Sequence, residues 1–209
     1  MPINENTNYF MDINDFFSLL DSKSNSILME TEILRNEIFP LLLNHIPKHA
    51  QIIYFDFDAW LRTYSTFHNL DQKIILINPN SIDLEQSLLS FLSWTVPSFD
   101  FLILDSLTTL YQMLDKSSDY NLTNQKFGYY FANIINLVNR INAKILISSF
   151  PITKNNYPWY KNYLGSKLMK HLTDNIVIID YKNTVIHCKF VQTIKPISRM
   201  DFCLRIKSP

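Results

Sequence analysis

Glycine is the residue that this sequence lacks most, because it occurs only at Gly128 and Gly165 in 209 residues. At an ordinary usage of about 7%, a chain of this length would carry roughly fifteen glycines. A loop that brings several backbone N–H groups together on a phosphate needs glycines at close spacing. The sequence therefore excludes the phosphate loop GxxxxGK[ST] and the dinucleotide-binding pattern GxGxxG.

Cysteine, charge and long apolar runs are also scarce. The two cysteines, Cys188 and Cys203, form no CxxC pair or Cys/His cluster, so we expect buried thiols and no zinc site. Nineteen basic and nineteen acidic residues give zero net charge, so any nucleic-acid contact must come from a local patch. No apolar run approaches the about 18 residues of a membrane span, and the polar N-terminus resembles no targeting signal. We therefore expect an intracellular protein without a membrane partner.

Short apolar runs alternate with helical patterns through the first two thirds of the chain. Runs that are apolar on both faces are typical of parallel strands covered by helices. The last strand-like runs have no helical pattern between them. The sequence predicts an α/β fold, with a mostly parallel sheet flanked by helices and antiparallel strands at the C-terminal edge. The expected strands are 26–29, 51–57, 73–77, 99–104, 143–148, 176–180, 185–191 and 201–206, and the main helices are 33–45, 83–94, 124–139 and 165–172.

The domain organisation is expected to be simple. Residues 1–20 form a polar lead-in whose aromatic residues are hard to bury in a bare extension, which indicates a segment that docks on a partner. These aromatic residues are Tyr9, Phe10, Phe16 and Phe17. Residues 21–209 are expected to form one core domain, since neither a linker nor a repeat interrupts them.

One expected strand, residues 99–104, is followed directly by Asp105. In open α/β sheets the ligand crevice lies at the carboxyl ends of the strands, where an aspartate can hold Mg²⁺ beside nucleotide phosphates. A strand that ends in aspartate is also common for turn reasons alone, so this position by itself does not identify a site.

The residues around Asp105 form a motif that is more specific than the aspartate alone. The stretch DSLTTLY at 105–111 resembles the DSxTxLY stretch of the RecA/RadA recombinase family. The stretch YFDFDAWLR at 54–62 resembles that family's YIDTEGTFR, with Asp58 at the place of the catalytic glutamate. Residues 83–89 resemble the family's EQ…LL helix, and the matches keep the family order over roughly residues 27–207. The resemblance implies a RecA-like fold.

The sequence departs from the family pattern at the positions that carry the family's nucleotide chemistry. The stretch at 27–37, where the family has its phosphate loop, contains three glutamates, neither glycine nor lysine, and Arg35 as its single cation. Asp58 is one methylene shorter than glutamate, and Phe150 falls near the family's phosphate-sensing glutamine. We therefore interpret Arg35, Asp58, Asp105 and Phe150 as positions of a degenerate nucleotide site, and expect no catalytic residue, cofactor or metal.

Two segments match the family's DNA-contacting loops. The segment 151–167 interleaves cations with aromatic rings, a pattern that suits phosphates and bases of a single strand. Aromatic residues also mark protein interfaces, so both interpretations stay open. The candidate DNA-binding residues are Lys154, Tyr157, Trp159, Tyr160, Lys161 and Lys167, together with Lys116 and Lys126 of the other segment.

A RecA-like core without a phosphate loop is similar to the small recombinase paralogs of the type found in the fungal Shu complex. This resemblance implies a non-enzymatic protein of homologous recombination repair, placed in the nucleus, or in the cytoplasm of an archaeon. Its expected partners are another recombinase paralog in a hetero-oligomer, the main recombinase, and single-stranded or branched DNA. Two alternatives stay open: a divergent RadA- or KaiC-like ATPase, and a scaffold that binds proteins only.

Overall fold

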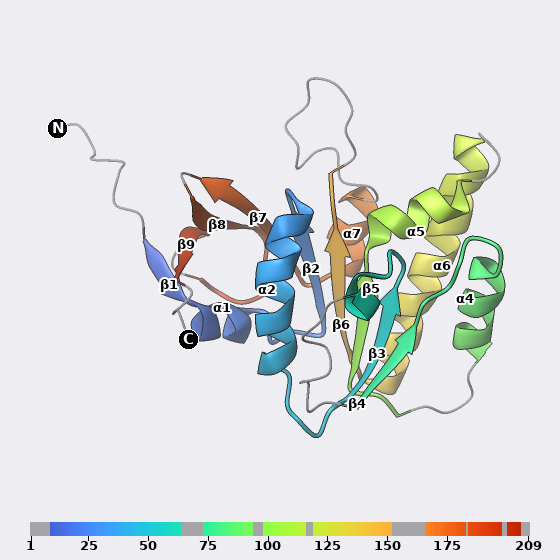
Figure 1. The fold of residues 1–209 in the computed structure, drawn as a ribbon, viewed down its shortest axis with the longest axis horizontal. Helices are drawn as coiled ribbons and strands as arrows, with labels where there is room; N and C mark the ends of the chain where they lie inside the picture. The colour runs from blue at the N-terminus through green and yellow to red at the C-terminus, as the bar shows by residue number, and fades with distance from the viewer. Residues whose placement is uncertain are drawn as a thin grey trace.

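The structure of this chain is a computed structural model, in which the elements follow one another in a largely alternating order (Figure 1). It describes residues 9–63, 73–93, 98–115, 119–151, 166–182, 184–197 and 200–205. The strands are β1 (Phe10–Asp12), β2 (Ser24–Met29), β3 (Gln51–Asp56), β4 (Lys73–Ile77), β5 (Phe101–Asp105), β6 (Lys144–Ser149), β7 (Asn175–Lys182), β8 (Val185–Gln192) and β9 (Asp201–Arg205). The helices are α1 (Ile13–Leu19), α2 (Glu32–His45), α3 (Trp60–Thr63), α4 (Leu84–Ser93), α5 (Leu107–Leu114), α6 (Tyr120–Ile141) and α7 (Ser166–Leu172).

All nine strands belong to one sheet with the order β1-β9-β8-β7-β2-β6-β5-β3-β4. The strands from β7 to β4 pair in parallel, whereas β8 is antiparallel to both β7 and β9. The predicted arrangement of a mostly parallel sheet with antiparallel strands at the C-terminal edge is confirmed. The outermost strand, β1, was not predicted, and it pairs in parallel with β9.

Helices cover both faces of the sheet and enclose two hydrophobic cores (Figure 1). The inner faces of α4, α5, α6 and α7 pack on one side, around residues such as Leu88, Leu110 and Phe131. The helices α1, α2 and α3 pack on the other side, around residues such as Phe39 and Leu61. Strands β2, β3 and β5 are almost wholly buried. This explains why the sequences of β3 and β5 are largely apolar on both faces. Strand β2 is apolar only in its second half, because it begins with the buried polar residues Ser24, Asn25 and Ser26.

The prediction that the aromatic residues of the lead-in would be hard to bury is wrong for two of the four. Phe16 and Phe17 lie on α1 and are 0% and 5% exposed, respectively. The Phe16 ring contacts Phe190 of β8 and Phe202 of β9, with centroid distances of 6.4 and 6.1 Å. Because β1 and α1 belong to the sheet and the core, residues 9–20 are not a bare extension.

The two cysteines lie on neighbouring strands, β8 and β9. Cys188 and Cys203 are free thiols and both are buried, as predicted. They lie one register position apart on β8 and β9, where Cys188 faces Phe202 and His187 faces Cys203. Within the described ranges, no helix combines the length and the apolar character that a membrane crossing requires.

Candidate functional site

The carboxyl ends of two neighbouring strands, β3 and β5, bring acidic side chains together. Strand β5 ends at Asp105, which lies beside Asp56 at the end of β3 in the parallel register. Asp58 follows two residues after Asp56, in the turn that leads to α3. Carboxylate oxygens of these three residues lie within 4.8 Å of one another. Such a cluster of oxygen atoms carries up to three negative charges in a mostly buried place, so it requires compensation.

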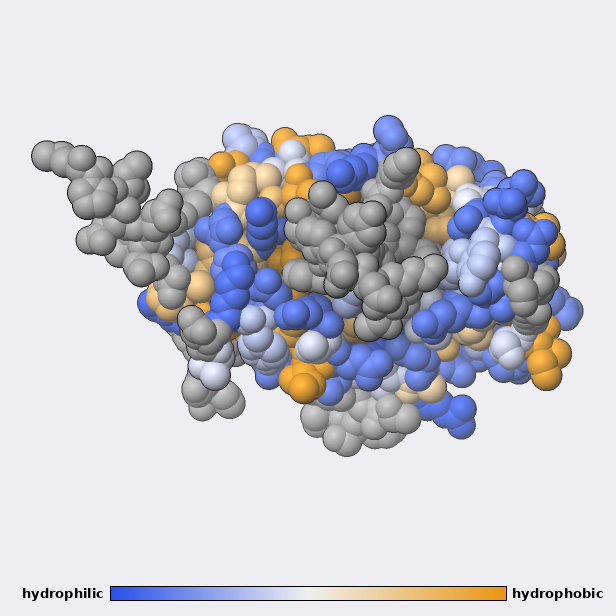
Figure 2. Space-filling view, turned by 90° about the horizontal axis from the view of Figure 1, so that it is seen from above, coloured by the Kyte–Doolittle hydropathy of each residue, from blue (hydrophilic) through white to orange (hydrophobic). Residues whose placement is uncertain are grey.

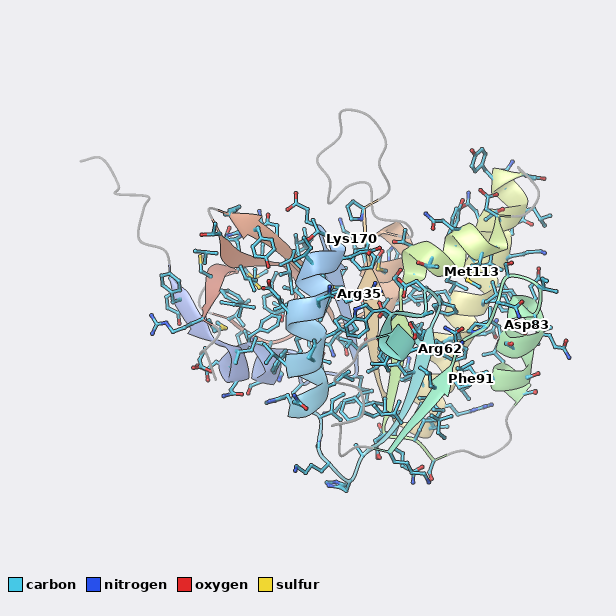
Figure 3. The ribbon with its side chains drawn as sticks, viewed as in Figure 1. Arg35, Arg62, Asp83, Phe91, Met113 and Lys170 are labelled. Carbon is cyan, nitrogen blue, oxygen red and sulfur yellow. The ribbon has the colours of Figure 1, made fainter. Side chains whose placement is uncertain are left out.

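Arg35 supplies this compensation. It belongs to the first turn of α2, which begins at Glu32, and it is 3% exposed. Its Nη1 atom lies 2.6 Å from the Asp58 carboxylate and 3.4 Å from Asp105. In Figure 3 Arg35 lies between α2 and the central strands. The guanidinium therefore occupies the space in which a cation would meet these acids.

Two aromatic rings hold the guanidinium of Arg35. Its central carbon lies 5.2 Å from the ring of Trp60 and 5.1 Å from the ring of Phe150. A guanidinium within about 6 Å of a ring centroid is attracted by the negative face of the ring. Burial lowers the pKa of Arg35, but Asp105 and Asp58 more than reverse this effect and raise the pKa overall. Arg35 is therefore a permanent cation of the site.

Asp105 is the most strongly bonded acid of the cluster. It accepts hydrogen bonds from the hydroxyl of Tyr54, at 2.6 Å, and from the hydroxyl of Ser148 on β6. Burial raises the pKa of Asp105 to about 6, although Arg35 and these donors oppose the rise. Burial also raises the pKa of Tyr54 well above its ordinary value, so the phenol stays protonated and donates a hydrogen bond to Asp105.

Three buried polar atoms at the site have no hydrogen-bond partner within the described part of the chain: Oδ1 of Asp56, Oδ1 of Asp58 and Nε of Arg35. Burial raises the pKa of Asp56, which the backbone N–H groups of residues 61 and 62 partly counteract. The site is thus satisfied around Asp105 and incompletely satisfied around the other two acids. The three carboxylates are the residues that could hold a metal, and Arg35 already lies among them.

The connection between β2 and α2 is very short. Strand β2 ends at Met29 and α2 begins at Glu32, so Glu30 and Thr31 alone join them. The N–H of Glu30 is bonded to the carbonyl of Ile179 on β7, which holds this connection against the sheet. The Thr31 side chain makes no capping hydrogen bond to α2.

The structure brings together all four positions that the sequence analysis assigned to a degenerate nucleotide site. Arg35 contacts each of the other three, namely Asp58, Asp105 and Phe150. Sequence reasoning missed Tyr54, Trp60 and Ser148. The first two lie within the YFDFDAWLR stretch, so that motif held a signal for them.

Most of the candidate DNA-binding residues lie outside the part of the chain that the structure describes. Lys154, Tyr157, Trp159, Tyr160 and Lys161 lie outside the described residues, as does Lys116. Lys167 lies on α7, but its side chain is not described. Lys126 lies on α6 and forms an ion pair with Glu85 of α4 at 2.7 Å, so much of its charge is compensated. Figure 2 looks onto the carboxyl ends of the parallel strands, where most of the coloured surface is hydrophilic.

Comparison with known proteins supports the fold. No protein-family model and no curated protein sequence matches this chain. Among solved structures, a KaiC-like protein from the hyperthermophilic archaeon Pyrococcus horikoshii OT3 matches with a TM-score of 0.59 and 8% identity. That alignment covers 87% of this chain and 84% of the archaeal protein.

A structure of the RadB recombinase matches with a TM-score of 0.56 and 12% identity, over 87% of this chain and 88% of that one. The chain has a RecA-like fold. With identities this low, the likeness extends to the arrangement of strands and helices alone.

Proposed function

We propose that this protein is a non-catalytic relative of the RecA-like recombinases, which acts in homologous recombination by binding DNA together with another recombinase paralog. The observation that carries the first half of the proposal is the position of Arg35. Its guanidinium fills the space among Asp58, Asp105 and the two aromatic rings, at the end of the sheet where open α/β folds bind ligands.

The neighbouring backbone supports the same conclusion. A triphosphate is bound by several N–H groups that converge from a loop before a helix. Here only Glu30 and Thr31 connect β2 to α2, and the N–H of Glu30 is already bonded to the sheet. Glu30 and Glu32 would place negative charge beside the phosphates. The residues present therefore do not fit Mg-ATP, and we propose no step that involves it.

Calorimetry with Mg-ATP tests this half of the proposal. We expect no heat of binding for the parent protein at millimolar nucleotide. The divergent ATPase remains the competing function, because the KaiC-like protein shares the fold and three acids lie together at the strand ends. Saturable binding at micromolar concentration would establish that alternative and end the non-catalytic proposal.

The second half of the proposal, DNA binding, rests on the sequence of residues 151–167. Three lysines and four aromatic residues without an acid suit a single strand, because lysines meet phosphates and rings stack on bases. Replacing Lys154, Lys161 and Lys167 together by Ala should weaken binding to all sequences alike. On a single strand the slope of log affinity against log salt should flatten by about two units, at roughly 0.7 per phosphate contact.

Fluorescence anisotropy with a labelled oligonucleotide over a salt series measures both effects. A matched control replaces Lys170, Lys182 and Lys189 by Ala. These lysines are exposed and lie outside the segment, so their replacement removes the same amount of charge. Equal losses in both triple variants would show that the segment is not the DNA site. If the parent binds no DNA, alone or with partners captured from native extract, a protein-only scaffold replaces the proposal.

A further inference from the structure

A cavity of about 710 Å³ lies at the amino ends of the parallel strands, opposite to the strand ends that carry the buried acids. It is bordered by α1, by the last turn of α2 and by the first residues of β5 and β6, towards the lower end of the sheet in Figure 1. Its apolar walls include Phe17, Leu42, Phe99, Phe101 and Leu146. A protein interior leaves few voids larger than a water molecule, whereas a ligand pocket encloses about 300–1,000 Å³ between mainly apolar walls. The cavity has the size and the lining of a ligand pocket.

The acids at the mouth of this cavity already accept hydrogen bonds. Lys144, whose ammonium group lies 5.6 Å from the ring centroid of Phe101, forms an ion pair with Asp21. The hydrogen bond from Lys144 lowers the pKa of Asp21, which therefore stays a carboxylate. Asp100 accepts a hydrogen bond from the backbone N–H of Gln51 at 2.8 Å. Each of the two acids thus has a donor within the protein.

Hydrogen-bond donors remain at the mouth after these bonds are made. An ammonium group has three N–H donors and a neutral imidazole has one, so Lys144 keeps donors beyond the one that Asp21 accepts. His45 lies in the last turn of α2 with its ring 5.0 Å from the ring of Phe17, and His49 follows four residues later. In the described part of the chain, neither imidazole makes a hydrogen bond to the protein. The mouth therefore complements a group that offers acceptor oxygens.

We propose that this cavity binds a small aromatic anion, that is, a ring that carries a carboxylate or sulfonate group. The ring packs against Phe17 and Phe101, because aromatic rings favour edge-to-face and offset-stacked contacts. The anionic oxygens accept hydrogen bonds from His45, His49 and Lys144. The site lies at the other end of the strands from the acid cluster, so it is independent of the proposed function.

Two fluorescent probes that differ only in a sulfonate group test the proposal on the full-length protein. The anionic probe is 8-anilinonaphthalene-1-sulfonate, and the neutral one is N-phenyl-1-naphthylamine. We expect the parent to bind one equivalent of the anionic probe saturably, with an affinity about tenfold higher than that for the neutral probe, because charge-assisted hydrogen bonds are added. Equal affinities, or no saturable binding, would overturn the proposal.

A filled cavity should lose both probes. Ser18 lies on α1, is exposed and lines the cavity, so Ser18→Trp places an indole in it without disturbing the core. We expect both affinities to fall at least about tenfold. The matched control is Ser93→Trp, at an exposed position of α4 on the other face of the sheet, and it should bind like the parent. Parent-like binding by Ser18→Trp would overturn the proposal.

The histidines separate recognition of the anion from filling of the apolar space. The double variant His45→Gln, His49→Gln should lower the affinity for the anionic probe about fivefold and leave that for the neutral probe unchanged. In carbon–proton correlation spectra of the parent, the imidazole signals of His45 and His49 should shift on addition of the anionic probe. The signal of His187, which is buried on β8, is the internal control and should not move. Shifts of all three signals would indicate binding to a loosened chain and would overturn the proposal.

Discussion

Replacing Arg35 by Met removes the cation that lies among three buried carboxylates. The side chain is 3% exposed and makes ion pairs of 2.6 Å with Asp58 and 3.4 Å with Asp105. Methionine is unbranched and adaptable, so it fills much of the space of the arginine stem. The change in the free energy of unfolding then reports mainly the lost charge. Removing one partner of a buried ion pair costs about 3–5 kcal/mol.

The size of this loss depends on pH because Asp105 can bind a proton. Its pKa is about 6 in the folded parent protein against 3.8 for an unperturbed aspartate, and Arg35 is one of the groups that restrain it. Without Arg35 the folded pKa rises further. A carboxyl group whose folded pKa is raised stabilises the protein below its unfolded pKa, and this contribution is lost as the pH rises through the folded pKa.

The parent protein should therefore lose about 2 kcal/mol of stability from this group between pH 4 and pH 7. In Arg35→Met the loss continues to higher pH. At pH 8 we expect the free energy of unfolding of the variant to be about 3–5 kcal/mol lower than that of the parent. At pH 5 the difference between the two proteins should be less than half as large. Urea unfolding followed by circular dichroism, at both pH values, measures these differences.

Two further variants make the experiment decisive. Asp105→Asn removes the unpaired charge, so the double variant with Arg35→Met should be at least about 1 kcal/mol more stable than Arg35→Met alone at pH 8. Lys170→Met removes an exposed cation from α7 and should change stability by less than about 0.5 kcal/mol. The reasoning is refuted if Arg35→Met costs less than about 1 kcal/mol at both pH values, or if the double variant gains nothing.

Two other substitutions follow from the buried contacts, and both are measured by the same urea unfolding. Phe16→Ala should destabilise the protein by about 3–5 kcal/mol, because its fully buried ring packs against Phe190 and Phe202; the exposed Phe10→Ala should cost less than about 1 kcal/mol, and equal small effects would mean that α1 detaches from the core. Tyr54→Phe should cost about 1–3 kcal/mol, because Asp105 loses a buried hydrogen-bond donor, and a neutral result would show that this bond is not formed.

The sequence was sufficient for the order of the main strands and helices because buried parallel strands are apolar on both faces. Strand β1 has three residues, and Asp12 interrupts its apolar character, so no periodicity identifies it. Helix α5 begins immediately after Asp105 and Ser106. Its first residues belong to the DSLTTLY motif, and the sequence pattern predicts no helix there. Both elements depend on tertiary pairing more than on local pattern.

The sequence predicts those site residues that belong to a motif at the end of a strand. Asp58 and Asp105 could be placed at one edge of a parallel sheet from their motifs alone. That Arg35 would pair with them could not be derived, because α2 reaches this edge only through the order β2-β6-β5-β3. Ser148 belongs to the site for the same reason, since β6 lies directly beside β5. Contacts between strands that are distant in sequence are set by topology, which residue patterns do not contain.

The buried charges at this site need a reason beyond stability. A buried ion pair can often be replaced by apolar residues of similar volume without loss, because the desolvation of the charges offsets their attraction. An apolar cluster would close the strand ends equally well and would leave no unpartnered oxygen at Asp56 or Asp58. It would not, however, place a cation against the ring of Phe150. The contact that distinguishes the charged cluster from an apolar one is thus the contact between Arg35 and Phe150, which ties α2 to the end of β6.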